Sequence, residues 1–66
     1  MSIKAIIRID DDKWEKHPFA IEFDDEECNR QFHKNYLDDR TACYRIIEKA
    51  KAAGFDIDPN IDEEFY

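Results

Sequence analysis

The most reactive side chains of this chain belong to two cysteines and two histidines, Cys28, Cys43, His17 and His33. Thiolates and imidazoles serve as zinc ligands or nucleophiles when their spacing brings them to one point, as in Cys-x-x-Cys. No such pair is present, and Cys28 and His33 lie five residues apart, about 140° around a helix. Both cysteines occupy apolar positions of a helical pattern, which is typical of buried, unreactive thiols. We therefore expect no metal and no cofactor.

A second candidate for metal binding is the motif Asp56-x-Asp58-x-Asn60-x-Asp62, whose oxygen ligands are spaced as in the first half of a calcium-binding EF-hand loop. The similarity ends at Ile61, which stands where that loop needs glycine for its sharp turn. The spacing therefore does not predict a calcium site.

Paired carboxylates are abundant, but acid–base catalysis of the glycosidase type needs one buried and one solvated carboxylate in a cleft. The runs Asp10–Asp12 and Asp24–Glu27 are polar throughout and predict a solvated surface. A chain of 66 residues also leaves little room for a substrate pocket. Its single glycine argues against a phosphate-binding glycine-rich loop, which needs several. We expect no catalytic residue and interpret the chain as non-enzymatic.

The charge of the chain is acidic and unevenly distributed. There are 17 acidic and 10 basic residues, a net charge of −7. Residues 24–39 carry −4, residues 40–54 carry +3 and residues 55–66 carry −5. Direct nucleic-acid binding and attachment to anionic membranes need clustered Lys and Arg, so we expect neither. No apolar run approaches the roughly 20 residues of a membrane span and no signal peptide is visible, so we expect a cytoplasmic protein.

The first 23 residues predict a β-hairpin that positions the rest of the chain. Residues 2–10 and residues 18–23 alternate between apolar and polar side chains, as half-buried strands do. The side chains expected to face the core are Ile3, Ala5, Ile7, Ile9, Phe19, Ile21 and Phe23.

Residues 24–54 follow a helical period. Asp24 and Glu27 form a capping-box pattern, and Gly54 suits the left-handed position after a helix end. The apolar stripe comprises Cys28, Phe32, Tyr36, Cys43, Ile46, Ile47 and Ala50. One continuous helix is our interpretation, and a second helix capped by Asp39 is the alternative. A continuous helix would overhang its sheet and present Leu37 and Tyr44 on its opposite face, which predicts a homodimer.

Residues 55–66 form an acidic tail. A short third strand is expected at 55–57, and Asp58 followed by Pro59 indicates the start of a C-terminal helical turn. The predicted fold class is α+β in a single small domain. It comprises a β-hairpin (1–23) packed on one long or two consecutive helices (24–54), then the short strand and the acidic helical turn (55–66).

These features favour a binding protein whose contact surface is acidic. We predict an inhibitor that occupies the nucleic-acid site of a basic protein, such as a nuclease or host-defence effector, by imitating phosphate charge. The alternatives are an antitoxin-like or subunit-type module that docks its C-terminal tail into a protein partner, and a dimeric structural protein. The candidate partner-binding residues are Asp24, Asp25, Glu26, Glu27, Asp56, Asp58, Asp62, Glu63, Glu64, Tyr44, Phe65 and Tyr66. The candidate dimer-interface residues are Leu37 and Tyr44.

Overall fold

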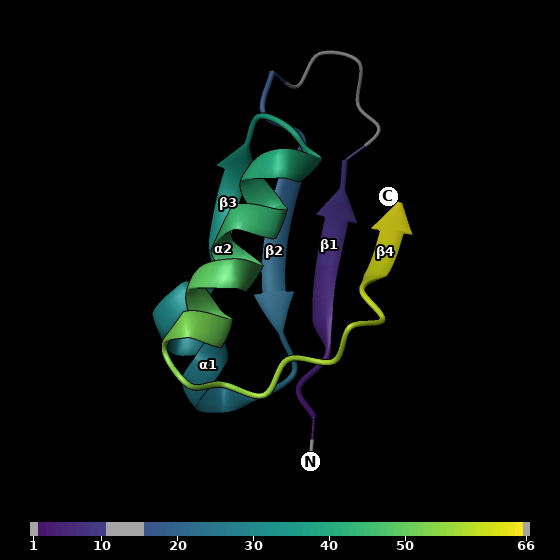
Figure 1. The fold of residues 1–66 in the computed structure, drawn as a ribbon. Helices are drawn as coiled ribbons and strands as arrows, with labels where there is room; N and C mark the ends of the chain where they lie inside the picture. Colours follow the sequence, from purple (N-terminus) through teal and green to yellow (C-terminus); the bar gives the residue numbers. More distant parts are fainter. Residues whose placement is uncertain (1, 11–15, 66) are drawn as a thin grey trace.

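The structure, a computed structural model, describes residues 2–10 and 16–65. Its elements are β1 (Ala5–Ile9), β2 (Phe19–Phe23), α1 (Glu26–Phe32), β3 (Lys34–Leu37), α2 (Arg40–Ala52) and β4 (Asp62–Phe65). The four strands form one mixed sheet in the order β3-β2-β1-β4. Helix α2 lies across the β2 and β3 side of the sheet, and α1 lies at the end where β2 finishes (Figure 1). The predicted α+β class is confirmed, whereas the predicted order of strands and helices along the chain is not.

The N-terminal hairpin is confirmed. Strands β1 and β2 are antiparallel, with Ile7 opposite Ile21, and both of these side chains are fully buried. The alternation of the two strands places the buried side chains toward the helices and leaves Ile6, Arg8 and Glu22 on the helix-free face. Burial of one face therefore sets the register of this pair, because a shift by one residue would reverse every side chain.

The single long helix is wrong, and two helices with a strand between them take its place. Strand β3 pairs antiparallel with β2 through Phe19 and Leu37. Within it, Tyr36 has φ 61°, a left-handed conformation that an α-helix cannot include. Tyr36 was predicted to belong to the apolar stripe, but 73% of it is exposed. Phe32 and Cys43 have the spacing of one helical stripe, but they belong to two separate helices with β3 between them.

The ends of the helices follow local capping chemistry. Asp25, rather than Asp24, is the N-cap of α1, and its carboxylate accepts a hydrogen bond from Cys28 N at 2.9 Å. Asp39 caps α2 by accepting from Ala42 N at 2.9 Å, as the two-helix alternative required. Gly54 has φ 101° after the last turn of α2, and its predicted left-handed conformation is confirmed.

The C-terminal segment is a strand and not the predicted helical turn. Residues Asp62–Phe65 form β4, which runs parallel to β1 with Glu63 opposite Ile7. The strand expected at 55–57 is reduced to one parallel bridge between Ile3 and Ile57. Both segments pair with the N-terminal part of the chain, because only one edge of β1 is used by its hairpin partner β2 and the other edge is open to a second strand.

One hydrophobic cluster joins the sheet to both helices. Its fully buried side chains include Ile7 and Ile21 from the sheet, Cys28 from α1, and Cys43 and Ile47 from α2. The rings of Phe32 and Phe55 meet edge-to-face at the border of this cluster, with their centroids 5.9 Å apart. Strands β3 and β4, which carry candidate residues, pair with the two central strands β2 and β1. The buried core therefore fixes where β3 and β4 lie.

The argument for a dimer from an overhanging helix no longer applies. Helix α2 has 13 residues, and Leu37 belongs to β3, where it packs partly buried against the core. Tyr44 is 43% exposed on α2. None of the helices in the described ranges 2–10 and 16–65 has the length and apolar composition needed to cross a membrane.

Candidate functional site

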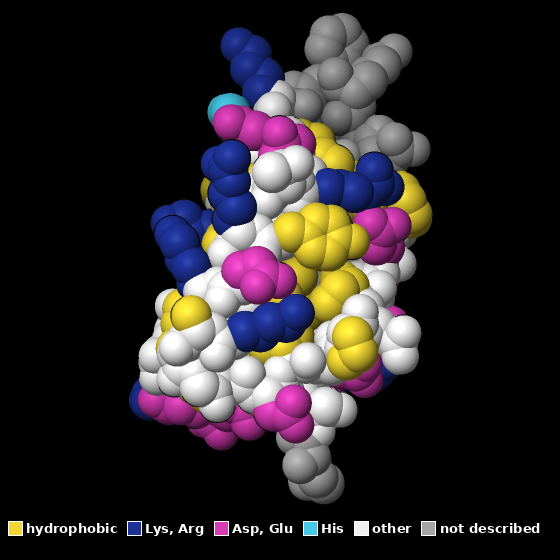
Figure 2. Space-filling model, in the orientation of Figure 1, with side chains coloured by type: hydrophobic (Ala, Val, Ile, Leu, Met, Phe, Trp, Pro, Cys, Tyr) yellow, Lys and Arg dark blue, Asp and Glu magenta, His cyan; other side chains and the backbone are white. Residues whose placement is uncertain are grey.

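The acidic residues of two distant segments meet at one end of the sheet, around Ile3 and Lys4. On one side, Lys4 N donates to the Asp24 carboxylate at 2.8 Å, and Asp24 N donates to the Lys4 carbonyl at 3.0 Å. On the other side, Ile3 N donates to the Asp56 carbonyl at 2.7 Å, and Asp58 N donates to the Ile3 carbonyl at 2.8 Å. Figure 2 shows acidic side chains gathered at this lower end of the molecule, around the start of α1. We call this surface the acidic end, comprising Asp24, Asp25, Glu26, Glu27, Asp56 and Asp58.

Four carboxylates of the acidic end have partners within the protein, and the bond of Asp24 to Lys4 N is one of these contacts. Asp25 caps α1, and Glu27 pairs with Arg30 and accepts from Gln31 at 2.9 Å. The carboxylate of Asp58 lies 3.5 Å from the Lys4 ammonium. The backbone N–H of Asn60 donates to Asp58 and, together with Lys4, lowers the pKa of that carboxyl.

Two other carboxylates of the acidic end point to solvent. Glu26 and Asp56 are exposed, and no side chain in ranges 2–10 and 16–65 pairs with either of them. Asp24 is also exposed, although it accepts the bond from Lys4. Unpaired carboxylates keep their full charge for a partner, whereas capping or ion-paired ones are already compensated. The charge available to a partner is therefore concentrated on Glu26 and Asp56, with the exposed Asp24 beside them.

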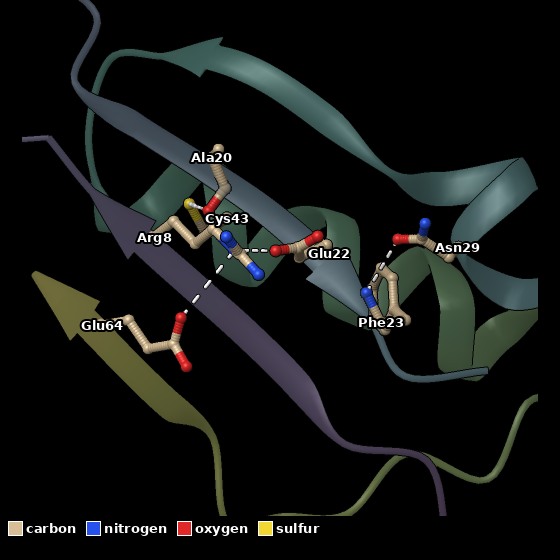
Figure 3. A network of polar contacts seen from close by, with 7 residues as sticks. All are labelled: Arg8, Ala20, Glu22, Phe23, Asn29, Cys43 and Glu64. Carbon is tan, nitrogen blue, oxygen red and sulfur yellow. Dashed lines mark hydrogen bonds and ion pairs between the residues drawn. The ribbon is translucent and has the colours of Figure 1, made fainter. Parts of the chain in front are cut away.

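The acids of β4 form a second group, which is largely compensated by arginines of the same chain. Arg40 of α2 donates to Glu63 at 2.8 Å. On the helix-free face, Arg8 of β1 lies between Glu22 of β2 and Glu64 of β4, with 3.9 Å between Arg8 Nε and Glu64 Oε2 (Figure 3). Asp62 is exposed and has no side-chain partner within the described ranges. β4 thus carries less free charge than its sequence suggests.

The aromatic candidates lie on the helix side of the sheet. Phe65 is 65% exposed and belongs to the same strand face as Glu63, while Tyr44 follows Arg40 by one turn of α2. The Arg40–Glu63 bond joins these two elements. Figure 2 shows hydrophobic side chains gathered between α2 and β4, with charged groups around them. We call Tyr44 and Phe65 with this ion pair the aromatic patch. Tyr66 lies outside the described residues.

A surface hollow beside β2 and β3 was not predicted from the sequence. It has a volume of about 290 Å³ and is lined by Asp10, His17, Pro18, Phe19, Ala20, Asn35 and Tyr36. Two of its lining residues, Asn35 and Tyr36, belong to β3. The prediction of one continuous helix assigned these residues to the helix, so it could not predict the hollow. The signal that could have revealed this strand is composition, since residues 33–39 contain His, Asn, Tyr and two Asp, all weak helix formers.

The predicted burial of the two cysteines is confirmed, and both thiols are free. Burial raises the pKa of Cys28, and it raises the pKa of Cys43 to about 11 with a contribution from Asp39. The Cys43 thiol faces the Ala20 carbonyl at 4.0 Å (Figure 3). Such thiols are protonated at neutral pH and are poor nucleophiles and poor ligands. No group of three or more His, Cys, Asp or Glu side chains in the described ranges is placed to hold a metal ion.

Comparison with known proteins gives no relative from which a function could be transferred. No family model, curated protein or solved structure matches this chain. Function is therefore inferred from the arrangement of the chain's own residues, above all from the acidic end and the aromatic patch.

Proposed function

We propose that this chain is a small, non-enzymatic binding protein that inhibits a nucleic-acid-binding protein by presenting carboxylates where the partner expects phosphates. The observation that carries the proposal is the meeting of two acidic segments around Ile3 and Lys4. These hydrogen bonds bring Asp24, Glu26 and Asp56 to one end of the molecule. A positively charged groove that binds phosphates would attract this end before contact and would lose it at high salt.

The proposed partner is a basic protein such as a nuclease or a host-defence effector. Its Lys and Arg side chains would bind the exposed carboxylates in place of a nucleic-acid backbone. We place the encounter in the cytoplasm, in keeping with two cysteines that remain free in the structure. The inhibitor would neither bind nucleic acid nor require a cofactor.

The test compares two doubly neutralised variants against a basic partner recovered from nuclease-treated lysate. Glu26→Gln with Asp56→Asn removes two charges from the acidic end, and Asp38→Asn with Glu48→Gln removes two charges elsewhere. We expect the first variant to bind about tenfold more weakly and the second to change affinity by less than about threefold. Added DNA or RNA should displace the wild-type chain. Equal affinities for the two variants, or no displacement by nucleic acid, would refute charge mimicry.

A second candidate function is a subunit-type module that docks through the C-terminal segment. The exposure of Phe65 (65%) and Tyr44 (43%) on one side of the molecule favours it. The segment would dock as part of the sheet, in β4, rather than as a free tail. Binding that resists salt and is lost on Phe65→Ala would support this module over the charge mimic.

A further inference from the structure

Strand β4 is an edge of the sheet. It pairs with β1 on one side, and no described strand lies on its other side (Figure 1). In a ladder, the backbone groups of a strand point alternately to its two neighbours, so half of those in β4 point away from β1. All four β4 residues are exposed. The strand therefore offers backbone donors and acceptors that a further strand can use.

The two faces of β4 differ in chemistry. Asp62 and Glu64 lie opposite Ile6 and Arg8 in the register, on the helix-free face. Glu63 and Phe65 lie opposite Ile7 and Ile9, on the face toward the helices. A strand added beside β4 would place its own side chains alternately on these faces. One set would lie beside Asp62 and Glu64, and the other would lie beside Glu63 and Phe65.

The charge of β4 argues against a second copy of this chain as the occupant. Antiparallel pairing of two β4 strands would oppose Asp62, Glu63 and Glu64 to like charges, which destabilises a strand pair. The other sheet edge, β3, contains Tyr36 at φ 61° and a register shift against β2, so it is a poor template for continuous pairing. An extended segment with basic side chains is the occupant that complements the β4 edge.

We propose that the β4 edge receives an extended basic segment of another protein as a fifth strand. Its Lys or Arg side chains would pair with Asp62 and with Glu64, which shares Arg8 with Glu22, and the intervening apolar side chains would lie beside Phe65. This proposal deepens the second candidate function, on which it rests, because it gives the docking mode and the chemistry of the partner. It does not depend on the acidic end.

The probe is an eight-residue peptide of alternating Lys and Val with blocked ends, and its affinity is measured by fluorescence anisotropy. A control peptide has the same composition in two blocks, Lys then Val, and so presents the same charge without alternation. We expect the alternating peptide to bind about tenfold more tightly. Equal binding of the two peptides would overturn the proposal, because charge alone would then account for the affinity.

Two N-methylated versions of the alternating peptide test the backbone contact. In an extended strand, the N–H groups of all Lys residues point to one edge and those of all Val residues point to the other. Methylating either set leaves the charge unchanged. We expect one version to lose about tenfold in affinity or more, and the other to bind as the parent peptide. Loss in both versions or in neither would overturn the fifth-strand proposal.

Variants of the protein locate the site. Asp62→Asn with Glu64→Gln should weaken binding of the alternating peptide about tenfold, and Glu26→Gln with Asp56→Asn should leave it unchanged. Circular dichroism of each variant confirms folding. An effect of the acidic-end variant alone would overturn the proposal. If the peptide fails while Phe65→Ala still abolishes binding of the recovered partner, the docking module stands and the fifth strand does not.

Discussion

Lys4 and Asp24 are joined by two reciprocal hydrogen bonds, from Lys4 N to Asp24 Oδ1 at 2.8 Å and from Asp24 N to the Lys4 carbonyl at 3.0 Å. The Lys4 ammonium also lies 3.5 Å from Asp58. Lys4, which immediately precedes β1, therefore connects two acidic segments that are about 30 residues apart in sequence. The acidic end is built by these contacts and not by either segment separately.

Replacing Asp24 tests this connection. Asp24→Ala removes the acceptor of Lys4 N, and we expect the free energy of unfolding to fall by about 1 kcal/mol. Asp24→Asn keeps an acceptor oxygen and should lose less. Asp56→Ala is the control, because the Asp56 side chain has no partner in the described ranges, and it should cost about 0.5 kcal/mol or less. Urea unfolding measures all three, and equal losses would contradict the assignment.

The N-cap of α2 gives a second prediction. Asp39 accepts from Ala42 N at 2.9 Å, so Asp39→Ala should destabilise the protein by about 1 kcal/mol. Asp39→Ser retains a capping oxygen and should restore most of this loss. The neighbouring Asp38→Ala removes an exposed pair with His17 and should cost less. Thermal unfolding followed by circular dichroism distinguishes the variants, and a loss at Asp38 as large as that at Asp39 would refute the cap.

Tyr36 should be a position where glycine stabilises. Its φ of 61° strains a residue with a side chain, and the side chain is mostly exposed, so little packing is lost on removal. We expect Tyr36→Gly to raise the free energy of unfolding by about 0.5 to 1 kcal/mol. Asn35→Gly, one residue earlier in β3, should lower it. Urea unfolding measures the stability of both variants against the wild type. Destabilisation by both substitutions would show that Tyr36 is unstrained.

The pH dependence of stability should include a contribution from Asp58. The Asn60 N–H and Lys4 lower the pKa of its carboxyl from the ordinary value of 3.8. A carboxyl with a lowered pKa in the folded state stabilises fully above its unfolded value, and this stabilisation is lost as the pH falls through the folded pKa. The stability difference between wild type and Asp58→Asn should therefore be constant near neutral pH and shrink below 3.8. A pH-independent difference in urea unfolding would count against this linkage.

The buried thiols should resist modification in the folded protein. Burial raises the pKa of Cys43 to about 11 and also raises the pKa of Cys28, so both are protonated near neutral pH. We expect a thiol reagent to label the native protein at least about 100-fold more slowly than the urea-unfolded chain, because labelling requires opening. The Cys43→Ala and Cys28→Ala variants report each thiol separately. Labelling of either thiol at the unfolded rate would place it at the surface.

The acids of the candidate site could be found by counting charge, but their grouping could not. Asp24 and Asp56 lie in different segments, and only the pairing of each segment with residues 3 and 4 brings them together. Similarly, Glu63 and Glu64 look like free charges in the sequence. The structure shows them beside Arg40 and Arg8, whose positions depend on how α2 and β1 meet β4.

Local patterns determined the hairpin, its buried face, the helix end at Gly54 and the buried cysteines, because alternation, backbone conformation and apolar period act over a few residues. The tertiary structure decided that 34–37 and 62–65 are strands. Lys34–Leu37 interrupts a helical period, and Asp62–Phe65 has three acids that disfavour strands. Each becomes a strand because a neighbouring strand supplies its hydrogen bonds, β2 for 34–37 and β1 for 62–65, and neither of these partners is adjacent to it in the sequence.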